Sequence, residues 1–204
     1  MKIIILVVII LINVIAVNSQ TVVNLLKNNS ITERTSNKTS FLISVKAGYH
    51  TAYDKENDAG FNSGLIFSGN ADIGLTENIY TGISYEFWNH SGEIVNIDNV
   101  KYSRNSTGSN ISFNIAWKTN FDPAGIYFGF GIGSYTVKSE WVNNNSSRSY
   151  LNFKFLAGLD IKLSKMFLLS TDIAYNAMTK LNTTEESDKA SMFSFKIGPT
   201  LILY

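Results

Sequence analysis

The stretch Ile126-Tyr-Phe-Gly-Phe-Gly-Ile-Gly-Ser134 decides the fold class of this chain. Along it, bulky apolar side chains alternate with a row made of one tyrosine and three glycines. Successive residues of a β-strand point to opposite faces, so a period of two places these rows on opposite sides of a sheet. The glycines leave space on their side for longer neighbours such as Lys118 or Lys154. The stretch therefore predicts a strand with one large apolar face.

The same alternation recurs along most of the chain, in segments of about ten residues, which is the signature of a membrane-spanning β-strand. Proline is nearly absent and Phe and Tyr are abundant, a balance that favours strands. We expect an all-β fold, an eight-stranded antiparallel up-and-down transmembrane β-barrel. The predicted strands are residues 41–53, 64–76, 79–89, 110–118, 126–138, 150–163, 166–177 and 191–204.

The connections alternate in length. Those after the first, third, fifth and seventh strands are long and polar, whereas those after the second, fourth and sixth are short. In an up-and-down barrel successive connections lie at opposite ends, so all the long ones gather at one rim. Bacterial outer-membrane barrels show this asymmetry, with the short turns on the periplasmic side. The predicted long connections are residues 54–62, 90–109, 139–149 and 178–190.

Charged side chains fall on one side of the predicted strands only. The apolar rows hold none, and a Lys or Arg that faces lipid at mid-bilayer costs roughly 2–4 kcal/mol. An eight-stranded barrel has an interior only wide enough for side chains, and buried charges need partners. We therefore expect a plugged lumen in which these charges pair. The predicted lumen charges are Lys46, Asp72, Glu86, Lys118, Lys154, Asp160, Lys162, Asp172 and Lys196.

Composition excludes several classes of function. The chain has 204 residues, a net charge of +1 and no cysteine. Near-neutral charge argues against a nucleic-acid partner, which usually demands a basic surface. The lack of cysteine excludes disulfides, thiolate metal sites and a thiol nucleophile. We expect neither a cofactor nor a metal.

The first 19 residues predict a signal peptide. Lys2 supplies a positive start, residues 3–17 are apolar apart from Asn13, and cleavage is expected before Gln20. The apolar stretch is short for a membrane helix, which needs about 20 residues. Residues 20–38 are rich in Asn, Ser and Thr and are expected to form a polar N-terminal extension, followed by the barrel over residues 39–204.

With this signal, these alternating strands and a terminal aromatic, Tyr204, the chain resembles the small eight-stranded outer-membrane β-barrel family. That family includes the transmembrane domain of outer-membrane protein A and its X- and W-type relatives, which are porin-like barrels. The resemblance implies location in the bacterial outer membrane, contact with its lipids and lipopolysaccharide, and recognition of Tyr204 by the assembly machinery. Ile202 fits the family's ending, but Phe193 lies in the other register. We expect a shift, for example a bulge, near Gly198-Pro199.

Tryptophans near strand ends mark the membrane interface in such barrels. Trp88, Trp117 and Trp141 are accordingly predicted to be interface anchors. We expect a structural function, or contact with an extracellular ligand through the long connections. We also expect no enzymatic activity and a monomeric protein.

Three alternatives stay open at this point. A membrane-embedded lipid-modifying hydrolase would use His90 with Ser91 and Glu93, although neighbours in sequence do not make a catalytic triad. A secreted lipocalin-like barrel would turn its apolar rows inward around an apolar ligand. A narrow channel would leave the lumen open.

Overall fold

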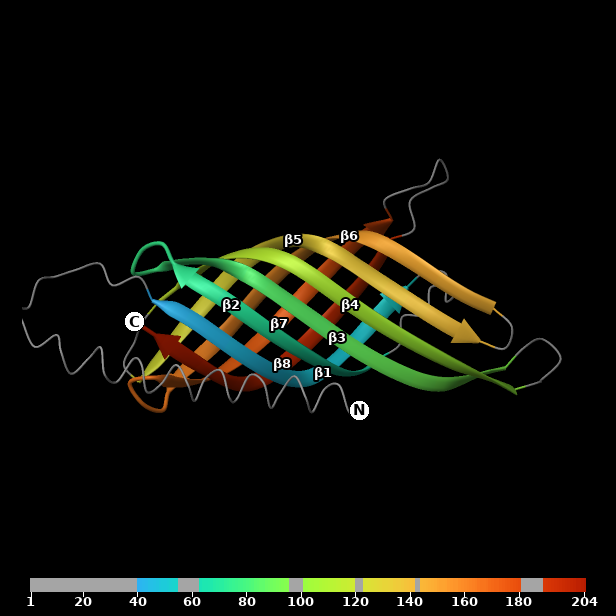
Figure 1. Cartoon of the computed structure of the whole chain (residues 1–204), viewed down its shortest axis with the longest axis horizontal. Coiled ribbons are helices and arrows are strands. Elements are labelled where there is room, and N and C mark those ends of the chain that lie inside the picture. Colours follow the sequence, from blue (N-terminus) through green and yellow to red (C-terminus); the bar gives the residue numbers. More distant parts are fainter. Residues whose placement is uncertain (1–39, 55–62, 96–100, 120–122, 142–143, 181–188) are drawn as a thin grey trace, which may run out of the picture. The chain divides into compact units, whose positions relative to one another are not determined.

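The computed structural model describes residues 40–54, 63–95, 101–119, 123–141, 144–180 and 189–204. The predicted signal peptide and polar extension lie outside these ranges. Within them the chain forms eight strands in one closed antiparallel barrel, in which each strand pairs with its sequence neighbours and β1 pairs with β8 (Figure 1). The predicted fold class is confirmed. The strands are β1 (Phe41–Asp54), β2 (Gly64–Gly74), β3 (Ile79–Val95), β4 (Lys101–Lys118), β5 (Ala124–Trp141), β6 (Asn144–Lys162), β7 (Phe167–Lys180) and β8 (Lys189–Leu203).

No helix among the described residues is long and apolar enough to cross a membrane.

The apolar rows face outward. Phe113 is 56% exposed, Phe128 55% and Phe155 53%, although each stands in the middle of a paired strand. A contiguous apolar surface of this extent is unfavourable in water, whereas it matches the acyl chains of a bilayer. A lipocalin-like barrel would need the reverse orientation, and the structure excludes it.

Two of the predicted long connections are wrong. Residues 90–109 and 139–149 are largely strand, because β3 and β4 continue to the pair Val95↔Lys101 and β5 and β6 continue to Trp141↔Asn144. These four strands project beyond the others at one end of the barrel (Figure 1). A bilayer enforces an apolar outward row only where that row meets lipid, and beyond it polar outward side chains such as Asn105 and Glu140 are tolerated. The sequence pattern therefore faded before the strands ended.

The predicted register shift in the last strand is also absent. β8 keeps one register with β7 through Ser170↔Gly198 and Leu169↔Pro199, and its register with β1 is the same on either side of these residues. Pro199 lies on the outward face, where its missing N–H leaves the register unchanged. Ile202 consequently belongs to the inward row.

Candidate functional site

The interior of the barrel holds the buried ion pairs of the described part of the chain. At its centre a carboxylate lies between two ammonium groups. Glu86 on β3 is fully buried. Lys154 on β6 donates a hydrogen bond to its Oε1 at 2.9 Å, and Lys196 on β8 donates to the same oxygen. Asn110 donates to the other oxygen at 2.9 Å. Every oxygen of this carboxylate therefore has a donor, which is what a buried charge requires.

A second ion pair lies closer to the short turns. Lys46 Nζ lies 2.7 Å from Oδ1 of Asp172, and both side chains are nearly inaccessible. The hydroxyl of Tyr127 also donates to Oδ1 of Asp172 and contacts the carbonyl oxygen of Thr171 at 2.8 Å. Lys46 lies 3.2 Å from the same hydroxyl. These contacts tie β1, β5 and β7 together across the lumen.

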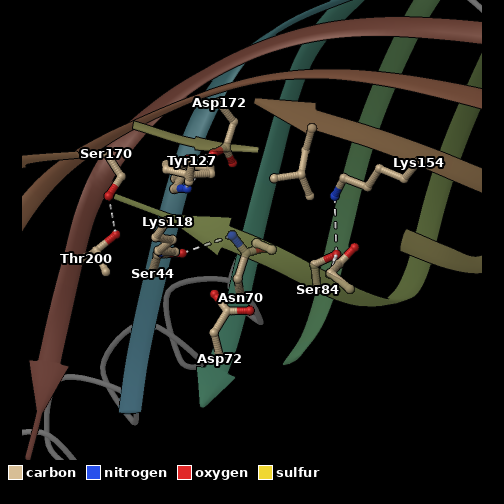
Figure 2. Close-up of a pocket in the computed structure, with 14 residues that line it drawn as sticks. Ser44, Asn70, Asp72, Ser84, Lys118, Tyr127, Lys154, Ser170, Asp172 and Thr200 are labelled. Atoms are coloured by element: carbon tan, nitrogen blue, oxygen red, sulfur yellow. Dashed lines mark hydrogen bonds and ion pairs between the residues drawn. The ribbon is translucent and has the colours of Figure 1, made fainter. Parts of the chain in front are cut away.

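Neutral polar side chains fill the space around the two ion clusters. Asn152 donates to Asn110 at 3.2 Å and to Asn176 at 2.9 Å. Figure 2 shows hydroxyl and amide groups from several strands lining the space beside Asp172. The hydroxyl oxygens of Ser170 and Thr200 are 2.6 Å apart. The cavity that remains among them is about 40 Å³.

The outer end of the lumen, beyond the ion clusters, is apolar. Trp88 lies two residues beyond Glu86 on β3 and is fully buried. It donates its indole N–H to the hydroxyl of Tyr135, which lies 3.3 Å from Sδ of Met192. We call this group the apolar plug. Its members are Ile66, Trp88, Tyr135, Val137, Tyr150, Met178, Ala190 and Met192.

The opposite end is more open. A cavity of about 450 Å³ at the short-turn mouth is lined by Lys118, Asp160, Lys162 and Tyr204 among others. Lys118 lies 3.5 Å from Asp160 and stands over the rings of Tyr80 and Tyr127. Lys162 is exposed at this mouth.

The nine predicted lumen charges have different positions. Five are buried in the two ion clusters and two form the pair at the mouth. Asp72 is half-buried near the pair of Lys46 and Asp172, where it lines the cavity of about 40 Å³. Lys162 lies at the rim of the short-turn mouth. The space above Gly131 and Gly133 receives Asn114 and Ser112, whereas the sequence suggested lysines there.

The three predicted interface anchors have different positions. Trp88 is wrong as an anchor, because its ring lies inside the barrel and never meets lipid. Trp117 is outward, 37% exposed, and packs against Phe128 with 4.9 Å between ring centroids. Trp141 ends β5, and its side chain lies outside the described residues. Tyr204 follows the end of β8 and is 69% exposed at the short-turn mouth; its part in assembly stays a prediction.

The residues of the hydrolase alternative do not face one another. His90 and Ser91 are consecutive in β3, so their side chains point to opposite faces. The side chain of Glu93 lies outside the described residues. Among those that are described, no group of three or more His, Cys, Asp or Glu side chains could hold a metal ion.

The apolar plug was missed from the sequence. The available signal was parity, because Trp88 shares its side of β3 with Glu86, on the row that carries charge. From the sequence, Trp88 is instead predicted at the membrane interface, because it is aromatic and lies near the predicted strand end.

Comparisons with known proteins agree with this architecture. A profile of the outer membrane protein beta-barrel domain matches residues 26–198. No curated protein sequence matches the chain.

Solved structures share the fold at low sequence identity. Neisserial surface protein A is similar with a TM-score of 0.61 and 13% identity, over 79% of this chain and 96% of that one. OprG from Pseudomonas aeruginosa is similar with a TM-score of 0.56 and 12% identity, over 82% and 97%. Ail of Yersinia pestis, in complex with the heparin analogue sucrose octasulfate, has a TM-score of 0.50 and 12% identity, over 81% and 99%. The profile matches most of the chain, and the apolar rows face outward around a charged lumen. This chain therefore belongs to the outer membrane protein beta-barrel family and resides in the bacterial outer membrane.

Proposed function

We propose that this protein is a sealed barrel that stabilises the outer membrane and presents a rigid sheet at the cell surface, without passing solutes. The observation that carries the proposal is the stacking of two barriers inside one lumen. The apolar plug excludes water and ions from the outer end, and the two ion clusters cross-link the wall below it. A cavity of about 40 Å³ between the strands accommodates only a few water molecules.

The energetics favour a closed state. Opening the lumen would separate Glu86 from Lys154 and Lys196, and breaking a buried pair costs about 3–5 kcal/mol. It would also expose the buried rings of Trp88, Tyr135 and Tyr150. Each fully buried large side chain contributes roughly 1.5–3 kcal/mol. An open state therefore has a negligible population.

Planar-bilayer recording tests the sealed lumen. The wild-type protein is expected to give no stepwise conductance at moderate voltage. A variant in which Trp88, Met178 and Met192 are all changed to Ala removes three side chains of the apolar plug, and its conductance shows how far the ion clusters seal the lumen without the plug. Regular conductance steps from the wild-type protein would remove the proposal.

A contact role at the surface is favoured by the projecting sheet. β6 pairs with β7 only from Tyr150↔Lys180 onward, so residues 144–149 have no partner on that side within the described chain. An unpaired strand edge presents N–H and C=O groups that can pair with another extended polypeptide. We propose this edge of β6 as the contact surface and an extended polypeptide as its partner.

A polyanion is a less suitable partner. The heparin analogue was bound by Ail, whereas here the predicted outer connections hold nine acidic residues against six basic ones. The net negative charge would repel sulfate groups, since like charges disfavour association.

Photocrosslinking on living cells tests the contact edge. A photoreactive amino acid in place of Ser147, on the unpaired edge, is expected to crosslink to a polypeptide. The same amino acid in place of Asn105, on β4 and paired with both of its neighbouring strands, should give little product. Equal products at both positions, or none at Ser147, would contradict the contact edge while leaving the sealed lumen untouched.

We propose further that the barrel acts as a monomer among lipids and lipopolysaccharide.

A further inference from the structure

The two histidines of the chain are 40 positions apart in sequence, yet they meet at the outer end of the lumen. His50 on β1 is the cross-strand partner of Gly64 on β2. Ile66 pairs with Trp88 on β3, so the same row continues from Gly64 toward His90. The row therefore runs from one histidine through a glycine to the other. Both side chains are on the inward face of their strands, His50 buried and His90 half-buried.

Gly64 leaves the space between the two rings. A Cβ placed on this glycine would lie 3.6 Å from Nδ1 of His90 and 4.0 Å from Nε2 of His50. One nitrogen of each ring is thus close to the same point. The tight curvature of an eight-stranded wall turns inward side chains of nearby strands toward each other.

His50 lacks a hydrogen-bond partner for either ring nitrogen among the described residues, although it is only 1% exposed. Its ring rests on Trp88, with 5.1 Å between centroids and 37° between planes, so the apolar plug forms the floor of the site. Leaving a buried polar group unpaired costs about 1–3 kcal/mol, and native proteins seldom leave such a group unexplained. The imidazole is therefore poised for a ligand that the described residues do not supply.

We propose that His50 and His90 together bind one divalent transition-metal ion of the Cu²⁺, Ni²⁺ or Zn²⁺ class. Imidazole nitrogens suit these ions, whereas Ca²⁺ and Mg²⁺ prefer oxygen ligands. A metal–nitrogen bond of about 2.0–2.1 Å needs the rings to move closer, and half-buried His90 has the freedom to rotate. Water from the outer end completes the coordination. Among divalent ions of this series Cu²⁺ binds most tightly.

The test is a Cu²⁺ titration of the full-length mature barrel, without a histidine purification tag, in detergent. Pulsed electron paramagnetic resonance is expected to show modulation from two imidazoles on a single bound ion. His90→Asn and His50→Phe should each leave one imidazole and weaken binding about tenfold or more, since even changes outside the ligand set cost about 10–100-fold. His50→Phe keeps an aromatic ring on Trp88.

Gly64→Ala is the decisive third variant, because it retains both histidines and fills the space between them. Its methyl group would make only ordinary contacts, so the barrel should fold, as heat-modifiable gel migration can verify. Copper binding should nevertheless weaken about as much as in the histidine variants. Wild-type copper without imidazole modulation, or with the same affinity in His90→Asn, would overturn the proposal. If His50→Phe fails to fold, His90→Asn and Gly64→Ala decide the question.

Discussion

Lys196 and Glu86 stand 110 positions apart in sequence, on β8 and β3, and are joined by a hydrogen bond in the middle of the lumen. Lys154 reaches the same carboxylate oxygen from β6 at 2.9 Å. One buried anion thus holds three strands that are not neighbours in the barrel. These ion pairs link opposite sides of the barrel wall. Their loss should destabilise the whole barrel, because the strands form one closed sheet.

Replacing Glu86 with Gln should destabilise the barrel by about 3–5 kcal/mol, because it leaves two buried ammonium groups without a counter-charge. The measurement is equilibrium unfolding by urea in lipid vesicles. Glu140→Gln is the matched control, since Glu140 is exposed on β5 and its change should stay within about 0.5 kcal/mol. Equal effects of the two variants would show that Glu86 does not brace the wall.

The pair of Lys46 and Asp172 should behave as a coupled unit. Asp172→Asn and Lys46→Met each leave one buried charged partner, so each should lower the free energy of unfolding by about 3–5 kcal/mol. The double variant should lose less than the sum, with a coupling energy of about 0.5–3 kcal/mol. Strict additivity in this cycle would mean that the 2.7 Å contact contributes nothing.

The fit of Trp88 into the wall depends on a glycine across from it. A Cβ on Gly108 would lie 2.2 Å from Cε2 and Nε1 of the indole, so Gly108→Ala forces the ring away. Overpacking of this kind costs about 1–3 kcal/mol. In a Trp88→Leu background the same change should cost much less, because the clashing ring is gone.

Unfolding curves and tryptophan fluorescence of these variants provide the readout. Gly69→Ala is the control, since its methyl group would meet only one atom, at 3.9 Å. That variant should keep its stability or gain up to about 1 kcal/mol through the unfolded chain. A Gly108→Ala barrel as stable as wild type, with unchanged fluorescence, would place Trp88 elsewhere.

The barrel wall was predictable because lipid imposes a simple rule on it. Phe113 and Phe128 could be assigned to the outside, and Glu86 and Lys154 to the inside, from a period of two and the exclusion of charge. Their partners could not be assigned, because pairing across the lumen depends on register and barrel shear, which no short segment encodes. Lys196 meeting Glu86 is a property of the closed cylinder.

The remaining misses occur where the lipid rule ends. Residues 90–95 and 144–149 are strand without the apolar alternation that marks a membrane span, and outward side chains described there, such as Ser91 and Ser147, are polar. Trp88 is aromatic and near the predicted strand end, which is also the description of an interface anchor. Only the fact that Trp88 shares its face of β3 with Glu86 distinguishes a position inside the lumen from one at the membrane interface. The convergence of His50 and His90 needed the cross-strand row through Gly64.

The cost of a charged side chain on the lipid-facing surface of a barrel depends on its depth in the bilayer. Measuring this cost checks directly whether the apolar rows face lipid. Phe113 lies within the outward apolar row of β4, which runs from Ile111 to Trp117, and is 56% exposed. Phe113→Arg should destabilise the barrel in vesicles by about 2–4 kcal/mol, because the guanidinium must sit near the bilayer midplane. Leu163→Arg, in the short turn after β6 and 65% exposed, should cost only about 0–1 kcal/mol near the interface. The two positions are similarly accessible, so area alone predicts equal effects, whereas lipid contact predicts a clear difference. Equal and small losses at both sites would mean that water, not acyl chains, covers Phe113, and the assignment of the apolar rows to lipid would have to be abandoned.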